Sequence, residues 1–232
     1  MNLLKLFLTL SIVSSILFNA FGQENLITES ETHIFWQENT VLTSKDFQGD
    51  CSSNPKLIKY CEELNLCVSA YVGVFVVLDI PKKKRNRGKL IEKAYFAPAF
   101  EKTTSCIMKL DSLGIKKQEV VFDIYELSAR FARRELANFQ DSVGAYGIIL
   151  TMFKSVEMKS IEMRNAFVDS YTQDIYINDR DGAFEEWRVK IDKLLEETKK
   201  YATKPEDCYR FVKNEPIDEN YKMAETVVGN LY

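Results

Sequence analysis

The sequence contains a single histidine, His33, among 232 residues. A zinc hydrolase that holds its metal through three imidazoles needs three histidines, so this chain cannot build such a centre. No Gly-x-Ser-x-Gly segment is present, and no cysteine has a recognisable base beside it, so neither a serine nor a cysteine nucleophile is indicated. His33 adjoins an aromatic pair and is expected to be a surface or sheet-edge residue rather than a metal ligand.

The sequence also lacks an excess of positive charge. It has 31 Lys and Arg against 34 Asp and Glu, which gives a formal net charge of −3. A dedicated nucleic-acid-binding protein carries a broad basic footprint, so nucleic acid is not an expected partner. Hydrophobic residues make up 46% of the chain, enough for one folded domain with a real core.

The longest hydrophobic run lies at the N-terminus and is too short for a membrane span. Lys5 precedes an apolar stretch at residues 6–18 that polar residues interrupt, whereas about 20 apolar residues are needed to cross a bilayer. Ala20 and Gly22 are small enough for a signal-peptidase site. Residues 1–22 are therefore predicted to be a secretory signal peptide that is cleaved before Gln23; the alternative is a membrane anchor. After cleavage we expect no transmembrane segment and a secreted or periplasmic location.

Five cysteines follow the predicted signal peptide: Cys51, Cys61, Cys67, Cys106 and Cys208. Export to an oxidising compartment permits disulfides, but an odd number leaves at least one thiol free or paired with another chain. No two cysteines have the two-residue spacing of a zinc knuckle. Bridges among the first three cysteines are favoured over a metal site.

A basic hairpin is the clearest local feature. Residues 69–80 are rich in Val, Tyr and Phe and predict a strand, and a second apolar run through residues 91–96 predicts its partner. Between them stand six cationic residues: Lys82, Lys83, Lys84, Arg85, Arg87 and Lys89. One interpretation is a solvated loop that keeps sheet edges from pairing; the other is contact with anionic lipid head groups or polysaccharide.

The second half of the chain predicts helices. Apolar residues recur at three- and four-residue steps over 119–136 and 144–177, and again after Asp181, which could cap a third helix. Residues 204–232 are expected to be a polar tail that Cys208 ties down. The predicted fold is therefore α+β: a small, mainly antiparallel sheet from the N-terminal half, packed with three helices from the C-terminal half, in one domain over residues 23–203.

Three separated stretches, in order, resemble a bacterial family of secreted proteins described as zinc-dependent proteases of the zincin type. The first stretch holds Trp36, Leu42-Thr43, Asp46-Phe47 and Gly49; the second holds Phe122-Asp123-Ile124; the third runs from Tyr171 to Trp187. The resemblance places the two helix-borne metal-binding histidines of the family on Lys117 and Val121. It places the catalytic glutamate on Gln118 and the third histidine on Ile177.

The resemblance thus implies a zincin-like fold that has lost its chemistry, because these four residues supply neither imidazoles nor a general base. No catalytic residue, metal or other cofactor is expected. Four nearby carboxylates could instead offer oxygens to calcium or magnesium: Glu119, Asp123, Glu126 and Asp174. The favoured alternative is that the three on the helix pair with Arg130 and Arg133 on a solvated face.

These observations predict an exported, non-catalytic pseudo-protease with a binding or structural role in the bacterial cell envelope. Its partner is unknown. The two possibilities are a peptide in the former cleft and an anionic envelope component that the basic hairpin contacts. Two other hypotheses stay open: an active secreted hydrolase that uses unrecognised residues, and a structural envelope protein without a ligand.

Overall fold

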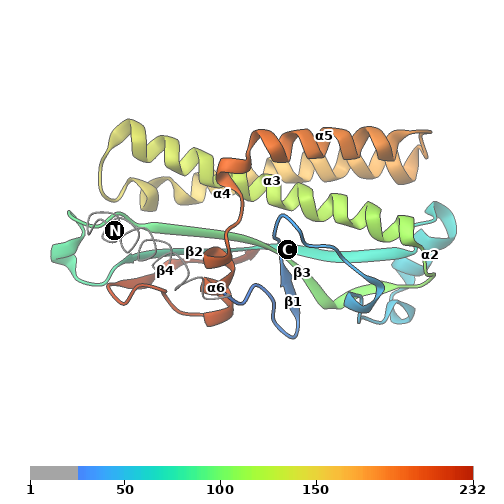
Figure 1. Ribbon diagram of the computed structural model, residues 1–232, viewed down its shortest axis with the longest axis horizontal. Coiled ribbons are helices and arrows are strands. Elements are labelled where there is room, and N and C mark those ends of the chain that lie inside the picture. The colour runs from blue at the N-terminus through green and yellow to red at the C-terminus, as the bar shows by residue number, and fades with distance from the viewer. Residues whose placement is uncertain (1–25, 232) are drawn as a thin grey trace, which may run out of the picture.

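The computed structural model describes residues 26–231, with side chains up to residue 225. The predicted signal peptide therefore lies outside the described residues. The chain forms one four-stranded antiparallel sheet in the order β1-β3-β2-β4, with helices on both faces (Figure 1). The strands are β1 His33–Phe35, β2 Val68–Pro81, β3 Lys93–Ile107 and β4 Tyr221–Leu231. The predicted α+β fold with an antiparallel sheet is confirmed.

The long hairpin β2–β3 forms the centre of the sheet. Its pairing runs from Val68 opposite Ile107 to Asp79 opposite Lys93, which confirms the predicted strand pair. Strand β2 is buried over most of its length because helices cover both of its faces. That burial explains why its sequence is almost continuously apolar rather than alternating.

Three helices lie on one side of the sheet: α3 Ser112–Val143, α4 Ile148–Thr172 and α5 Ala183–Glu197. Helices α3 and α4 pack on the strands, and α5 packs on α3. They correspond to the three predicted helices. Helix α4 passes directly into a π-helical turn, η4 Gln173–Ile177. Helix α5 follows Gly182, whose φ of 72° ends the preceding turn, so the predicted cap at Asp181 is wrong. Phe96 of the sheet stacks on Phe153 of α4, with ring centroids 5.4 Å apart, at the centre of this layer.

The segment expected to be a polar tail is part of the fold. Residues 205–213 form helix α6 (Pro205–Lys213) on the other face of the sheet (Figure 1), and strand β4 pairs with β2. The guanidinium of Arg210 in α6 donates two hydrogen bonds, of 2.7 and 2.8 Å, to the buried carboxylate of Asp79 in β2. Phe211 packs on Phe75 and Phe35 beneath the sheet. These contacts fix the C-terminal segment to the domain.

The cysteines pair only partly as expected. Cys61 and Cys67 form a disulfide within the predicted cluster, but Cys51 pairs with Cys106 on β3. Cys208 is free and buried, so it does not tie the C-terminal segment through a disulfide. Burial raises the pKa of the Cys208 thiol well above its usual range, which keeps it protonated and unreactive.

The remaining helical elements are short. Helix α2 Pro55–Leu64 starts at the cap Asn54 and carries Cys61. Four 3-10 turns complete the list: η1 Ser44–Asp46, η2 Cys51–Ser53, η3 Lys84–Asn86 and η5 Lys199–Tyr201. Within residues 26–231, no helix is both long enough and apolar enough to cross a lipid bilayer.

Candidate functional site

The four positions that the resemblance assigns to a former metal site fall on α3 and on the π-helical turn η4. Gln118 is buried: its side-chain oxygen accepts a hydrogen bond from the Ala70 amide, and its side-chain nitrogen donates one of 3.1 Å to the Tyr176 hydroxyl. The ammonium of Lys117 lies 5.2 Å from the centre of the Tyr176 ring. Tyr176 therefore contacts two of the four positions, and it directly precedes a third, Ile177.

Packing, rather than an open site, characterises these positions. Val121 packs against the apolar cluster that contains Tyr171, Tyr176 and Trp187, and the Ile177 side chain is exposed. The Tyr171 hydroxyl donates a hydrogen bond of 2.9 Å to the Lys117 carbonyl, and burial raises the pKa of Tyr176 to about 12. The two tyrosines are thus neutral, hydrogen-bonded core residues: Tyr171 joins α3 to the end of α4, and Tyr176 joins α3 to the π-helical turn.

The acidic residues weighed as oxygen ligands all have partners in the protein. Asp123 accepts hydrogen bonds of 2.7 Å from the Trp36 indole and from Arg188. Asp174 accepts one of 2.8 Å from the Trp187 indole. Within residues 26–231, no group of three or more His, Cys, Asp and Glu side chains is arranged to hold a metal ion.

Glu126 was expected on a solvated helix face, and that expectation is wrong. Its carboxylate is fully buried and accepts hydrogen bonds from Arg130 at 2.7 Å and from the backbone amide of Thr203 at 2.8 Å. Arg133 also belongs to this cluster, with a nitrogen 3.8 Å from the same carboxylate. For Glu126 the predicted partners are correct, but the network is internal and holds the segment before α6 against α3. For the other two helix carboxylates the predicted partners are wrong: Asp123 pairs with Arg188, and Glu119 accepts the Leu42 amide.

A groove of about 420 Å³, here called the Trp36 groove, lies beside these carboxylates. The residues that line it come from the segment after β1, from α3, from α5 and from the turn η5: Trp36, Gln37, Glu38, Thr40, Val41, Glu119, Phe122, Asp123, Arg130, Arg188, Asp192, Leu195, Glu196 and Lys199. Most of its charges neutralise one another, as in the pairs Arg188–Asp192 and Lys199–Glu38. Burial raises the pKa of Glu119, whose carboxylate accepts the Leu42 amide.

The sequence did not indicate that Trp36 and Arg188 meet at Asp123. They are 87 and 65 residues away from it along the chain, and no local pattern reports such contacts. The only signal was the type of residue: a tryptophan and a carboxylate that each need a partner once they are partly buried.

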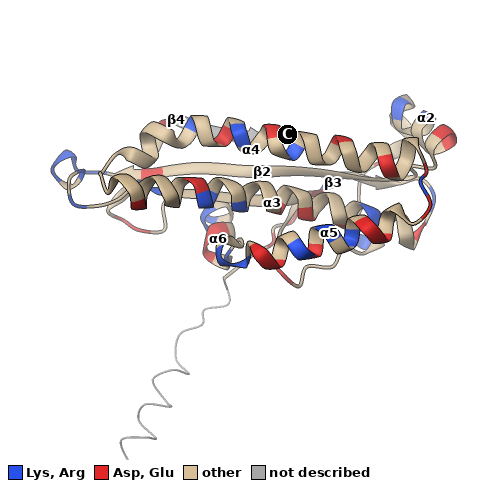
Figure 2. Cartoon of the chain, turned by 90° about the horizontal axis from the view of Figure 1, so that it is seen from above, with Lys and Arg blue, Asp and Glu red and all other residues tan. Residues whose placement is uncertain are grey.

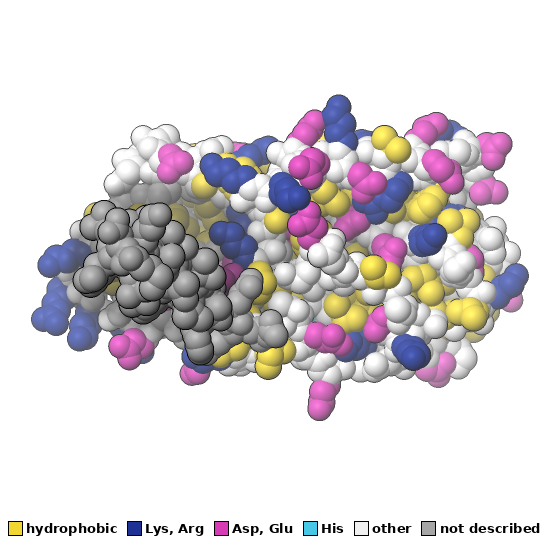
Figure 3. All heavy atoms as spheres, in the orientation of Figure 1, with side chains coloured by type: hydrophobic (Ala, Val, Ile, Leu, Met, Phe, Trp, Pro, Cys, Tyr) yellow, Lys and Arg dark blue, Asp and Glu magenta, His cyan; other side chains and the backbone are white. Residues whose placement is uncertain are grey.

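The basic hairpin is confirmed as a separate feature at one end of the molecule. We call its six cationic residues the basic tip: Lys82, Lys83, Lys84, Arg85, Arg87 and Lys89. All six are exposed, and they form a blue group at the end of the hairpin in Figure 2 and a dark-blue group at the corresponding end in Figure 3. None of them forms an ion pair with any residue that the structure describes.

Backbone hydrogen bonds give the basic tip a defined shape. The amide of Asn86 donates to the Lys83 carbonyl at 2.8 Å, and the amide of Leu90 donates to the Asn86 carbonyl at 2.9 Å. The nearby acid Asp218 pairs with Lys93 at 3.0 Å, outside the tip. The six charges are therefore presented together on an ordered turn. Lys82, at the start of the tip, lines a shallow hollow with the acids Glu215, Asp218 and Glu219 but forms no ion pair with them.

Comparisons with known proteins identify no relative: no family model, no curated protein and no solved structure matches this chain.

Proposed function

We propose that this chain is an exported, non-catalytic protein that binds an anionic component of the bacterial cell envelope through the basic tip. The observation that carries the proposal is the group of six exposed cations on one ordered turn, unpaired with any described residue. Clustering like charges raises the free energy of a folded protein unless a partner neutralises them. An anionic surface would supply that neutralisation.

The position of the tip argues against the protection of a sheet edge. Its residues lie beyond the last β2–β3 pair, Asp79 opposite Lys93, and the outer strands of the sheet are β1 and β4. Charges that discourage edge-to-edge pairing lie on the edge strand itself. The tip instead projects away from the domain (Figure 2), as a contact with a flat partner would need.

The rest of the molecule would orient this contact. Removing the six tip cations from the formal charge of −3 leaves −9 on the remaining residues. An anionic surface would attract the tip and repel the body of the domain. The same asymmetry would make binding sensitive to salt, because exposed charges are screened within about 10 Å at 0.1 M ionic strength.

The non-catalytic part of the proposal draws on the residues at the former metal-site positions. Gln118 cannot act as a general base, and it is engaged with Ala70 and Tyr176. We place less weight on a peptide in the Trp36 groove, because the Asp123 carboxylate there is already engaged by Trp36 and Arg188. The two disulfides fit an oxidising, extracytoplasmic environment.

The test is sedimentation of the mature protein with vesicles of phosphatidylglycerol or of phosphatidylcholine, and a parallel titration with soluble polyphosphate. Comparing the two kinds of vesicle distinguishes binding to an anionic lipid surface from binding to a neutral one. The polyphosphate titration distinguishes binding to a lipid from binding to a soluble polyanion. We expect binding to at least one anionic partner and none to phosphatidylcholine. Failure to bind either anionic partner would overturn the proposal.

A matched pair of variants tests the site. The tip variant carries Lys83→Gln, Lys84→Gln and Lys89→Gln; the control carries Lys45→Gln, Lys109→Gln and Lys116→Gln, three exposed lysines outside the tip that form no ion pair with a described residue. Each basic residue near an anionic membrane contributes about 1 kcal/mol, so the tip variant should bind about 100-fold more weakly. An equal loss in the control would show that only net charge matters.

A further inference from the structure

A second groove lies at the opposite end of strand β2 from the basic tip, beside the disulfides, and we call it the Tyr60–Tyr71 groove. Its volume is about 530 Å³, within the range of small-molecule sites. The residues that line it are Asp50, Ser53, Asn54, Lys56, Leu57, Tyr60, Ser69, Tyr71, Thr103, Thr104 and Cys106. Two tyrosines, hydroxyl groups and an amide dominate this lining, in contrast to the paired charges of the Trp36 groove.

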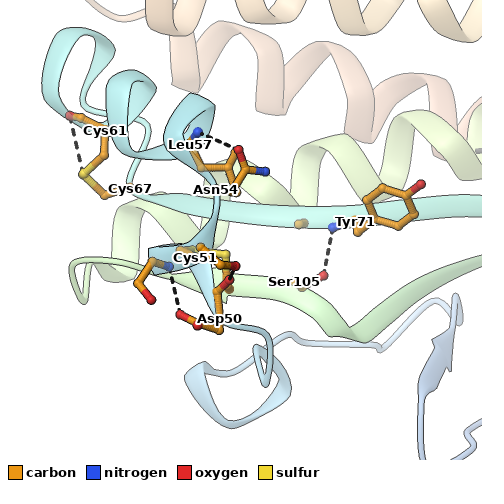
Figure 4. Close-up of a disulfide and its surroundings, with 12 residues drawn as sticks. Asp50, Cys51, Asn54, Leu57, Cys61, Cys67, Tyr71 and Ser105 are labelled. Atoms are coloured by element: carbon orange, nitrogen blue, oxygen red, sulfur yellow. Dashed lines mark hydrogen bonds between the residues drawn. A yellow bond between two sulfur atoms is a disulfide. The ribbon is translucent and has the colours of Figure 1, made fainter.

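Covalent links make the walls of the groove rigid. The disulfide Cys51–Cys106 fastens the η2 turn to β3, and Cys61–Cys67 fastens the end of α2 to the residue before β2 (Figure 4). Gly49 brings the chain so close to β3 that a Cβ atom there would lie 2.8 Å from the Thr103 carbonyl oxygen. A preformed groove of this kind loses little conformational entropy when a ligand binds.

A β-bulge sets the position of Tyr71. The register of β2 against β3 shifts between Ser69 and Tyr71, and the Tyr71 amide donates to the Ser105 hydroxyl at 2.8 Å (Figure 4). Ser105 in turn donates to the Glu101 carbonyl at 2.6 Å. Bulges redirect side chains and are common beside functional sites. Here the bulge leaves the Tyr71 side chain 42% exposed on the groove.

Most polar groups of the groove are neutral donors and acceptors. Its only formal charges are those of Asp50 and Lys56, which sum to zero. The side-chain oxygen of Asn54 caps α2, which leaves its amide NH₂ for a ligand. Among the described residues, the hydroxyls of Tyr60, Ser69 and Thr104 have no hydrogen-bond partner.

We infer that the Tyr60–Tyr71 groove binds a neutral oligosaccharide. A sugar ring offers a C–H face that packs on a tyrosine ring and hydroxyls that both donate and accept hydrogen bonds, which matches this lining. A charged ligand would find no net opposite charge here, and a purely apolar ligand would leave the hydroxyls without partners. This inference is independent of the basic tip.

The test is isothermal titration calorimetry on the full mature protein with its disulfides intact. The two ligands are tri-N-acetylchitotriose and cellotriose. We expect one of these sugars to bind, and we expect Tyr71→Ala to weaken that binding roughly tenfold, since a lost aromatic contact typically weakens a complex by about this factor. Tyr60→Phe keeps the ring and removes only the hydroxyl, so it should weaken binding less while preserving the fold. The tip variant should bind the sugar as the wild type does.

Tyr146→Ala is the matched control, because Tyr146 is an exposed tyrosine that does not line the groove. It should bind sugar as the wild type does. The inference is overturned if neither sugar binds, or if Tyr71→Ala binds as well as the control variant.

Discussion

Replacement of Arg210 by alanine tests whether the C-terminal segment is an integral part of the domain. Arg210 and Asp79 are 2% and 1% exposed, and the two hydrogen bonds between them are 2.7 and 2.8 Å long. The variant would leave the Asp79 carboxylate buried without its cation. Loss of one partner of a buried ion pair costs about 3–5 kcal/mol. Since small domains have unfolding free energies of about 5–15 kcal/mol, this is a large share of the total.

The assay is urea denaturation of the mature protein, with disulfides intact, followed by circular dichroism. The double variant Asp79→Leu with Arg210→Met removes both charges and should recover most of the lost stability, because apolar residues of similar size often replace buried pairs without loss. The control is Arg180→Ala, whose pair with Glu186 is exposed and should leave the midpoint unchanged.

The reasoning fails if Arg210→Ala unfolds at the same urea concentration as the wild type. It also fails if the double variant is no more stable than Arg210→Ala, because the loss would then come from packing of the arginine side chain and not from the unpaired carboxylate.

Two further predictions concern stability. Burial raises the pKa of Glu119, so folding favours its protonated form and this group lowers stability as pH rises through the folded-state pKa. Glu119→Gln should therefore raise the thermal midpoint near pH 7 but not near pH 3. An equal effect at both pH values would contradict this prediction. Removing the disulfide Cys51–Cys106, which spans 55 residues, by paired alanine substitutions should lower the unfolding free energy by about 4 kcal/mol in urea denaturation. Removing Cys61–Cys67, which spans 6 residues, should lower it by about 2 kcal/mol. The reverse order would refute the loop-length argument.

Local patterns were sufficient for the central elements of the fold. The β-branched run at residues 69–80 and the basic turn after it predicted the hairpin, because strand preference and turn chemistry act over neighbouring residues. The three- and four-residue apolar spacing predicted α3, α4 and α5 for the same reason.

The failures involve contacts between distant residues. Asp79 stands in an apolar strand, which signals a buried charge that needs a partner, but nothing local identifies Arg210, 131 residues away. Helix α6 had its own signature, with Pro205 in its first turn and the acids Glu206 and Asp207 after it. The overall polarity of that region hid this signal, because only one side of α6 is apolar, the side that packs on the sheet.

The same limit applies to the candidate sites. The cluster of cations in the basic tip is contiguous in sequence, so composition alone located it. The Tyr60–Tyr71 groove combines α2, β2 and β3, and its shape depends on the Cys51–Cys106 pairing, which the sequence left open. Glu126 was expected in solvent because the sequence does not show which segment covers a given helix face. In the fold, the segment around Thr203 covers Glu126.

The measurement that tests the non-catalytic claim most directly is elemental analysis of the mature protein purified without chelator. With one histidine and with Gln118 engaged by Tyr176, we expect far less than one equivalent of zinc or any other transition metal. One equivalent of a transition metal that persists through gel filtration would contradict the account.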